Sequence, residues 1–352
     1  MVRMVKKIAV YILIAAVGIA GIYMLSRTFF PASMQTYPFR SLTAKNSTPT
    51  PYPLYELTIP YLRSRTYEST LGNREVYEQH TNYTSYITSY DSDGLTIQGL
   101  LTIPTGKMPK RGWSAIVFVH GYIPPNQYET TAKYEDYVDY LAKNGFVVFK
   151  IDLRGHGNSQ GVATGAYYSA DYVIDTLNAY AALQKVGFVN ASKIGLWGHS
   201  MGGNVVMRAF AAKPTIPAVS IWARAVYSYS DTQKYGISDS SYQRRPSNSP
   251  RQNTRQNVSD RYGNPGSDSA FWYDMAPTNF LSDLKGAIHI SHAIDDTMVN
   301  IGYSRDLMTL LDKTRVVHEF YEYTNGGHNI ADPSFVPAMQ NTVSFYKKYL
   351  AQ

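Results

Sequence analysis

The sequence contains one short motif that could hold a reactive serine. Residues 198–202 read Gly-His-Ser-Met-Gly, the pattern G-x-S-x-G, and they lie between an apolar segment at 193–197 and a helical pattern at 204–212. In this context the motif predicts a sharp strand-to-helix turn, because glycines avoid collisions between side chains and the backbone. Such a turn exposes the Ser200 hydroxyl at a helix N-terminus, where free N–H groups stabilise negative charge. The motif therefore predicts a serine nucleophile, and a glycine-rich turn without chemistry is the alternative.

A serine hydroxyl is a weak nucleophile unless a base removes its proton, and the chain has eight histidines. His328 directly follows two glycines in a loop after the predicted strand 316–323. It is also the last histidine, which agrees with the order serine, acid, histidine typical of sites built on such a turn. We therefore expect His328 to be the base. His120 precedes the serine motif, and we interpret it as a structural loop residue.

The base needs a carboxylate that orients its ring and stabilises its charged form. Asp295 and Asp296 follow a predicted strand at 287–290 and lie between Ser200 and His328 in the sequence. Only one of these neighbours can hold the orienting position, and the other is expected to cap the loop. The residues alone leave both assignments open.

Acyl transfer also needs hydrogen-bond donors for the oxygen that becomes negatively charged. Residues 119–122 read Val-His-Gly-Tyr and end a predicted strand at 114–119, at the same edge of the sheet as the serine motif. We expect the backbone N–H groups of Tyr122 and Met201 to form this oxyanion hole.

Short apolar segments alternate with helical patterns from about residue 86, and these elements must position the groups above. Most segments are apolar at nearly every position, as strands covered on both faces are. The first two are joined by a turn at 91–94, which indicates an antiparallel hairpin, and a helix is expected at 169–185 with Ser169 as its N-cap. The alternation predicts an α/β fold with a mostly parallel central sheet and helices on both faces. The predicted strands are residues 87–90, 95–104, 114–119, 146–151, 193–197, 218–222, 287–290 and 316–323.

Several short blocks in this region resemble the α/β-hydrolases of the prolyl-oligopeptidase and dienelactone-hydrolase type. The similarity runs from about residue 86 to residue 350, and the order and spacing of the blocks make it specific. The blocks are Ser92-Asp93-Gly94, residues 99–104, His120-Gly121, residues 152–159 (Asp-Leu-Arg-Gly-His-Gly-Asn-Ser), residues 198–203, residues 292–299 and Gly327-His328.

The resemblance implies an α/β-hydrolase fold and cleavage of ester or peptide bonds through an acyl-enzyme. It also implies that Asp296 is the acid, because the family often reads H-G-x-x-D-x-x-V-P here. This chain has Ala293 in place of the glycine and Asn300 in place of the proline, and neither change removes a catalytic group. The residues before 86 are too few for the β-propeller of the large oligopeptidases.

Three functions are compatible with these residues. An esterase that cleaves acyl esters is expected first, and a serine peptidase with the same triad second. A non-catalytic, membrane-tethered binding protein is disfavoured by the complete set of Ser200, Asp296 and His328. No metal or other cofactor is expected, because histidine pairs with metal-ligand spacing are missing from the sequence. Nucleic acid is not an expected partner, and the sequence leaves the oligomeric state open.

The first 26 residues are expected to form a signal anchor. Residues 8–25 carry no charge, and as a helix they would reach about 27 Å, enough to cross a hydrocarbon core. The basic residues Arg3, Lys6 and Lys7 precede this segment, so the N-terminus should stay in the cytoplasm and the catalytic domain should lie outside. The alternative is a cleaved signal peptide and a secreted protein, although no A-x-A cleavage site follows the apolar segment.

Three further parts are expected after the anchor. Residues 27–85 are polar and interrupted by prolines, which is typical of a stalk, and the hydrolase domain is expected at 86–352. Within it, residues 228–268 are rich in Ser, Asn, Gln and Arg and predict an irregular insertion, which could be a lid. Five arginines of this insertion contribute to the net charge of +7, and with no cysteine in the chain, disulfides and thiolate ligands are excluded.

Overall fold

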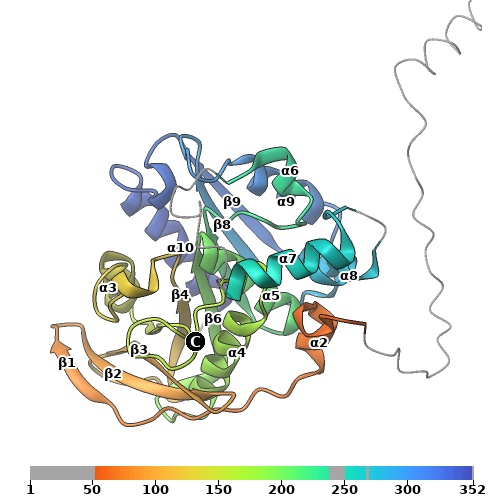
Figure 1. Cartoon of the computed structure of the whole chain (residues 1–352). Coiled ribbons are helices and arrows are strands. Elements are labelled where there is room, and N and C mark those ends of the chain that lie inside the picture. The colour runs from red at the N-terminus through yellow and green to blue at the C-terminus, as the bar shows by residue number, and fades with distance from the viewer. Residues whose placement is uncertain (1–51, 238–249, 267–268, 351–352) are drawn as a thin grey trace, which may run out of the picture. The chain divides into compact units, whose positions relative to one another are not determined.

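The alternating pattern of strands and helices forms a nine-stranded sheet in the computed structural model, which describes residues 52–237, 250–266 and 269–350 (Figure 1). The strand order is β1-β2-β3-β5-β4-β6-β7-β8-β9. The pairs from β1 to β5 along this order are antiparallel, and those from β5 to β9 are parallel. The strands are β1 Glu75–Gln79, β2 Tyr83–Ser92, β3 Leu95–Pro104, β4 Trp113–Val119, β5 Val147–Ile151, β6 Val189–His199, β7 Ala218–Trp222, β8 Ala287–Ala293 and β9 His318–Tyr323.

Helices cover both faces of the sheet. Among the described residues, α4 and α5 pack with one hydrophobic cluster and α3 and α10 with the other, and Figure 1 shows these pairs on opposite sides of β4 and β6. The prediction of a mostly parallel sheet with helices on both faces is therefore confirmed. The helices are α2 Ile59–Ser64, α3 Glu135–Lys143, α4 Asp171–Gln184, α5 Met201–Ala212, α6 Asp231–Tyr235, α7 Pro250–Tyr262, α8 Ala270–Met275, α9 Gly302–Leu311 and α10 Phe335–Tyr349.

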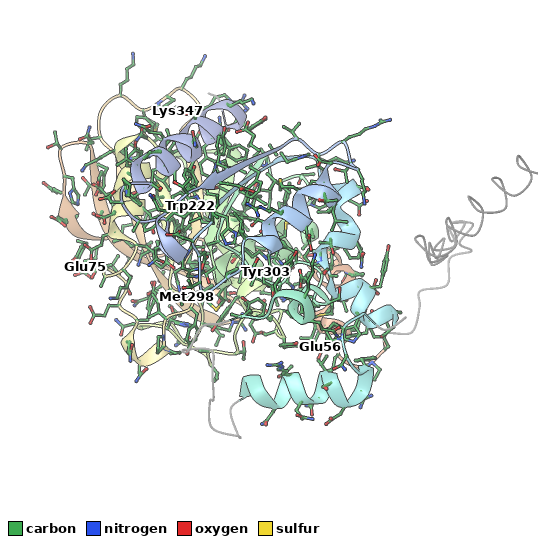
Figure 2. All side chains as sticks on the ribbon, turned by 90° about the horizontal axis from the view of Figure 1, so that it is seen from above. Glu56, Glu75, Trp222, Met298, Tyr303 and Lys347 are labelled. Carbon is green, nitrogen blue, oxygen red and sulfur yellow. The ribbon has the colours of Figure 1, made fainter. Side chains whose placement is uncertain are left out.

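Central strands are recognisable in the sequence because both of their faces are covered. Every residue of β5 and β7 is buried, which explains why these strands show continuous apolar segments. Trp222 closes β7, and its indole N–H donates to the Thr342 hydroxyl of α10 at 3.1 Å. In Figure 2, Trp222 lies inside the molecule, whereas Lys347 of α10 lies at the surface.

The edge of the sheet differs from the prediction. β1 was not expected, because all five of its side chains are exposed and its sequence has no apolar alternation. The expected hairpin is formed by β2 and β3, and its two turn residues, Asp93 and Gly94, have φ angles of 56° and 78°. Two consecutive positive φ values are typical of the tight turns that match the twist of paired strands.

The start of α4 also needs a correction. Its N-cap is Ala170, one residue after the predicted Ser169. The Ser169 hydroxyl still accepts the N–H of Asp171 at 3.0 Å, so it satisfies one of the free donors at the helix start from outside the cap position.

The compact body begins earlier than the expected boundary at residue 86. Leu57, Ile59 and Leu62 are buried in the same hydrophobic cluster as α4 and α5, and Pro51–Gln352 forms one compact unit. The buried guanidinium of Arg208 in α5 donates to the carbonyl of Leu57 at 2.6 Å. The expected stalk over 27–85 is therefore wrong from residue 52 onward, because apolar side chains and hydrogen bonds of this segment bind it to the body.

The insertion at 228–268 is partly helical rather than irregular. It contains α6 and α7, and α7 has 13 residues. Val258 is the one buried side chain among the residues of α7 whose side chains are described. The sequence therefore has no apolar stripe from which a helix could have been predicted.

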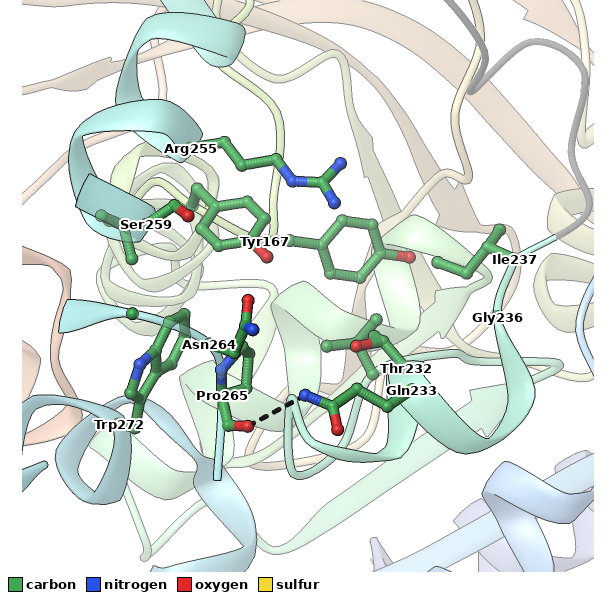
Figure 3. Close-up of a pocket in the computed structure, with 14 residues that line it drawn as sticks. Tyr167, Thr232, Gln233, Gly236, Ile237, Arg255, Ser259, Asn264, Pro265 and Trp272 are labelled. Carbon is green, nitrogen blue, oxygen red and sulfur yellow. Dashed lines mark hydrogen bonds between the residues drawn. The ribbon is translucent and has the colours of Figure 1, made fainter. Parts of the chain in front are cut away.

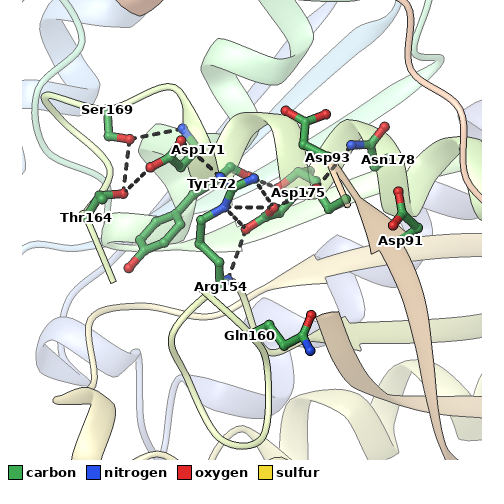
Figure 4. Close-up of polar contacts among 12 residues, drawn as sticks. Asp91, Asp93, Arg154, Gln160, Thr164, Ser169, Asp171, Tyr172, Asp175 and Asn178 are labelled. Atoms are coloured by element: carbon green, nitrogen blue, oxygen red, sulfur yellow. Dashed lines mark hydrogen bonds and ion pairs between the residues drawn. The ribbon is translucent and has the colours of Figure 1, made fainter. Parts of the chain in front are cut away.

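A buried ion pair fixes the loop after β5 to α4 (Figure 4). Arg154 donates from Nη2 to Asp175 Oδ1 at 2.7 Å, and Asp175 is fully buried. Arg154 also contacts Asp171 at 3.1 Å, and the Ser92 hydroxyl of β2 donates to Asp175 at 2.7 Å. The pair thus joins three parts of the fold at the edge of the sheet where the serine motif lies.

In the described part of the chain, no helix is long and apolar enough to cross a membrane. The expected anchor at residues 8–25 lies outside the described residues.

Candidate active site

Ser200 lies at the predicted turn between a strand and a helix. β6 ends at His199, α5 begins at Met201, and Ser200 has φ 52° and ψ −117° between them. The turn requires glycine at Gly202, because a Cβ there would lie 2.2 Å from the carbonyl oxygen of Val119. The backbone N–H of Ser200 donates to the carbonyl of Trp222 at 2.8 Å, which ties the strained residue to the neighbouring strand.

His328 and Asp296 are brought together although 32 residues separate them. His328 lies in the short 3-10 helix η5 (Gly327–Asn329), after β9. Its Nδ1–H donates to Asp296 Oδ2 at 2.8 Å. The other ring nitrogen, Nε2, is thereby left for the proton of a hydroxyl group.

Asp296 is held by four hydrogen bonds in total. Its Oδ1 accepts the backbone N–H groups of Met298 and Val299 at 2.8 and 2.9 Å, and its Oδ2 accepts Nε2–H of His292 at 3.2 Å as well as His328. Burial alone would raise the pKa of this carboxyl, but the hydrogen bonds from His292 and His328 outweigh burial and hold the pKa well below its ordinary value. Asp296 is therefore a carboxylate at neutral pH.

Asp295 has a different place from its neighbour. Its two oxygens accept the backbone N–H groups of Gly327 and Gly326 at 2.8 and 3.3 Å. It therefore caps the loop that carries His328 and does not contact the imidazole through a hydrogen bond in the described structure.

Ser200 and His328 line one pocket of about 310 Å³ at the carboxyl edge of the parallel strands. Among the described residues, no hydrogen bond joins the Ser200 hydroxyl to His328, and such contacts commonly tighten only when substrate binds. The residues that line the pocket are Gly121, Tyr122, Ile123, Lys133, Tyr134, Tyr137, His199, Ser200, Met298, His328 and Asn329.

The expected oxyanion donors follow the ends of two neighbouring strands, β4 and β6. Tyr122 follows β4 and lines the pocket, and Met201 is the first residue of α5, directly after Ser200. N–H groups in the first turn of a helix have no partner within the helix, so that of Met201 is available to an oxyanion. His120, by contrast, is buried, and its ring nitrogens lie 2.7 and 3.1 Å from the carbonyl oxygens of Gly121 and Asp152.

Several polar residues of the site were not predicted, among them His292, His199 and Tyr134. His292 and His199 lie within sequence blocks that carry the family resemblance, so the signal for them was present without a role. Tyr134 has no sequence signal, because its position depends on the path of the loop between β4 and α3.

A second pocket of about 430 Å³ lies beneath α7 (Figure 3). Arg255 and Ser259 of α7 line it together with Tyr167 and Trp272, and Gln233 donates to the carbonyl of Pro265 at 3.2 Å. Among the described residues it shares no lining residue with the pocket of Ser200, and the described part of 228–268 contributes no lining residue to that pocket. The expectation of a lid from this insertion stays a prediction.

Metal ligation has no candidate in the part of the chain that the structure describes, because no group of three or more His, Asp or Glu side chains there could hold an ion.

Comparison with known proteins agrees with this architecture. Residues 112–231 match the family model described as serine aminopeptidase, S33. A protein of Sclerotinia sclerotiorum described as "Probable dipeptidyl-aminopeptidase B" is 22% identical over 280 residues, which are 76% of this chain and 27% of that protein. The chain thus spans about a quarter of the length of this relative.

Solved structures share the fold at low sequence identity. Acetyl xylan esterase 1 from Thermoanaerobacterium has a TM-score of 0.58 at 16% identity, covering 85% of this chain and 96% of the esterase. Dipeptidyl peptidase 4 of Porphyromonas gingivalis has a TM-score of 0.59 at 18% identity, covering 76% of this chain and 36% of the peptidase. The shared fold is that of the α/β-hydrolases, and the sequence matches show that this chain is similar to serine hydrolases that include esterases and peptidases.

Proposed function

We propose that the protein hydrolyses acyl esters through an acyl-enzyme on Ser200, with His328 as the base and Asp296 as the orienting acid. The observation that carries this proposal is the 2.8 Å hydrogen bond between His328 and Asp296 beside a strained serine that lines the same pocket. This combination supplies the nucleophile, the base and the orienter of a serine hydrolase.

The reaction would proceed in two steps, acylation of Ser200 and hydrolysis of the acyl-enzyme. His328 Nε2 takes the Ser200 hydroxyl proton as the oxygen attacks the ester carbonyl, and the same proton passes to the leaving alcohol when the C–O bond breaks. Water then attacks the acyl-enzyme with His328 again as base, which releases the carboxylic acid and restores Ser200. Asp296, ionised at neutral pH, stabilises the imidazolium in both steps.

Negative charge on the carbonyl oxygen would be stabilised by two backbone donors. The N–H groups of Tyr122 and Met201 come from different elements on either side of Ser200, and removal of one such donor typically costs about 10²–10³ in kcat. The helix N-terminus at Met201 adds a favourable partial positive charge.

The pocket favours an ester over an aminopeptidase substrate. A free α-ammonium group binds best to a carboxylate, and the described lining contains no Asp or Glu. Its single side chain with a permanent charge is Lys133, which would repel an ammonium. The second candidate, a serine peptidase with the same triad, is supported by the aminopeptidase family model and the dipeptidyl-aminopeptidase relative.

The proposal is tested by labelling and by a substrate comparison. A fluorophosphonate should label the wild-type protein covalently and leave Ser200→Ala unlabelled with its fold intact, because the hydroxyl is the attacking group. Undiminished labelling of Ser200→Ala would refute the assignment and reopen a non-catalytic binding role. Hydrolysis of short p-nitrophenyl esters should exceed that of aminoacyl-arylamides, and the opposite ranking would favour the peptidase.

We also propose that the protein is a single-pass membrane protein with its catalytic domain outside the cytoplasm. The support is the uncharged segment at residues 8–25 and the three basic residues before it. Secretion after signal cleavage is the alternative.

A further inference from the structure

The ring of His199 connects three loops of the candidate site. Its Nδ1 lies 2.7 Å from the hydroxyl of Tyr134, and its Nε2 lies 2.9 Å from the backbone carbonyl oxygen of His328. The hydroxyl of Tyr134 in turn accepts the backbone N–H of Gly121 at 2.8 Å. This series of hydrogen bonds thus begins at Gly121, next to the expected oxyanion donor Tyr122. It passes through Tyr134 and His199 and ends at the loop of His328.

The donor and the acceptor of each hydrogen bond in this series can be assigned. A carbonyl oxygen can only accept, so His199 must carry its proton on Nε2. Burial and the neighbouring His328 lower the pKa of His199 to about 3, so the ring is neutral and its Nδ1 is an acceptor. Tyr134 therefore donates its proton to Nδ1, and its oxygen receives the N–H of Gly121.

The backbone holds Tyr134 in this place at a cost. Lys133 and Tyr134 both have left-handed φ angles, 63° and 60°, which residues other than glycine rarely adopt. The buried ammonium of Lys150 contacts the carbonyl oxygens of Ala132 and Lys133 at 3.3 and 3.4 Å. Strained residues persist only where their surroundings fix them, and here they direct the hydroxyl at Gly121 and His199.

The contact also leaves no space at Gly121. A Cβ on this glycine would lie 2.5 Å from the Tyr134 hydroxyl oxygen and 3.1 Å from Nδ1 of His199. The loop before Tyr122 is therefore fixed by close packing as well as by a hydrogen bond.

We propose that Tyr134 is a positioning residue for acyl transfer: its hydroxyl fixes the Gly121–Tyr122 loop, and with it the oxyanion donor, relative to Ser200 and His328. Tyr134 acts through Gly121 and His199, whereas its ring forms part of the pocket wall. This inference rests on the proposed function, because it assigns the N–H of Tyr122 to the oxyanion.

Tyr134→Phe removes the hydroxyl and keeps the ring. We expect kcat for p-nitrophenyl acetate to fall about 10- to 100-fold with KM within about twofold, because displacing an oxyanion donor costs up to what its removal costs. The inhibition constant of phenylboronic acid, which forms a tetrahedral adduct with serine, should rise by a similar factor. A merely structural role would lower the folded fraction without changing this constant for the folded enzyme.

Tyr140→Phe is the matched control. Tyr140 lies on α3, the helix that begins directly after Tyr134, and its hydroxyl makes no hydrogen bond among the described residues, so this variant should retain wild-type kcat and inhibitor affinity. Activity and boronate affinity within twofold of wild type in a folded Tyr134→Phe would overturn the inference.

His199→Gln gives a second approach if Tyr134→Phe does not fold. Glutamine can keep a donor for the His328 carbonyl but lacks the acceptor that faces Tyr134. We expect a loss similar to that of Tyr134→Phe and, where both fold, no further loss in the double variant. Wild-type boronate affinity in His199→Gln would contradict the proposed series of hydrogen bonds. So would a double variant whose fold-loss equals the product of the two single losses.

Fluorophosphonate labelling of Ser200→Ala separates the two proposals. Persistent labelling of Ser200→Ala refutes the proposed function itself. Loss of labelling in Ser200→Ala together with an unaffected, folded Tyr134→Phe refutes only the role of Tyr134.

Discussion

His292 donates its Nε2 proton to the same oxygen of Asp296 that accepts His328, at 3.2 Å. The proton must be on Nε2, because this atom faces only acceptors, Asp296 and the carbonyl oxygen of Val299 at 2.9 Å. The Nδ1 of His292 lies 2.8 Å from the Ser304 hydroxyl. His292 is therefore a buried support for the acid.

His292→Leu should weaken catalysis through Asp296. The carboxylate loses one of its two imidazole donors and becomes free to rotate away from His328, so we expect kcat to fall about tenfold with little change in KM, as for other supporting partners of a reactive group. His318→Leu, at a partly exposed histidine that contacts Asp312, is the control for steady-state kinetics and should have wild-type values. An unchanged kcat in folded His292→Leu would show that the backbone donors alone hold Asp296.

The two neighbouring carboxylates should have unequal effects on catalysis. Asp296→Asn should lower kcat by about 10⁴, the scale seen when an orienting carboxylate is neutralised in a serine protease. Asp295→Asn should cost less than about tenfold, because the hydrogen bonds of Asp295 to the described residues are those from the N–H groups of Gly326 and Gly327. Single-turnover kinetics of both folded variants would measure the difference, and a reversed ranking would exchange their roles.

Acid should destabilise the fold well above the range where carboxylates titrate. Burial lowers the pKa values of His120, His199 and His289 to about 3, whereas in the unfolded chain each titrates near 6.5. Between these values the unfolded state binds more protons, so the free energy of unfolding falls as pH falls, by about 2 kcal/mol per histidine from pH 7 to 5. Urea unfolding at both pH values would measure this change.

His289→Met provides the matched variant for that measurement. His289 lies in the middle of β8, away from the residues that line the Ser200 pocket, and its Nδ1 lies 2.9 Å from the Ser220 hydroxyl. Removing it should reduce the pH-dependent loss by the contribution of one histidine, about 2 kcal/mol, whatever its effect on absolute stability. An identical pH-dependent loss in this variant would mean that His289 is not buried in its neutral form.

The buried pair of Arg154 and Asp175 should dominate the stability of the loop after β5. Arg154→Met leaves Asp175 charged, fully buried and without a cation, which should cost about 3–5 kcal/mol in chemical unfolding. Arg65→Ala breaks a more exposed pair with Asp93 and should cost less than about 1 kcal/mol. Equal costs for the two variants would contradict the dominance of the buried pair.

Membrane topology can be tested on intact cells. External protease should remove the hydrolase domain and leave a small membrane-bound fragment, because the anchor proposal places the domain outside. N-terminal sequencing should start at the native start of the chain. A mature N-terminus near Ser33 with activity in the medium would indicate a cleaved signal peptide, and full protection until lysis would place the domain in the cytoplasm.

The sequence predicts most of the fold because the strands that build it are buried on both faces. β7 has the predicted bounds, Ala218–Trp222, since all five of its side chains are buried and four of them are apolar. β1 and α7 were missed because their side chains are mostly exposed, so neither leaves a hydrophobic period. The structure of these two elements is determined by the parts of the protein that pack beside them and not by their own composition.

The residues of the candidate site also divide into those with a sequence pattern and those without one. Ser200, His328 and the aspartate pair stand out as candidates in the sequence because their motifs combine chemical type with a fixed place after a strand. Tyr134 could not, because two left-handed residues in a loop decide where its hydroxyl lies. The hydrogen-bond partner of Gly121 is thus a property of the folded loop rather than of any local pattern.

The segment from residue 52 to Ser64 relates to the remainder of the domain as a bound peptide relates to its receptor. It inserts Leu57, Ile59 and Leu62 into the core, and its Arg63 donates to the carbonyl of Ala211 at 2.8 Å, while Gly72, Asn73 and Arg74, which connect it to the sheet, are exposed. Cleaving the chain at these exposed residues would therefore yield two fragments with complementary surfaces. Their recombination in solution would be fragment complementation, with the shorter piece acting as a ligand that completes the core.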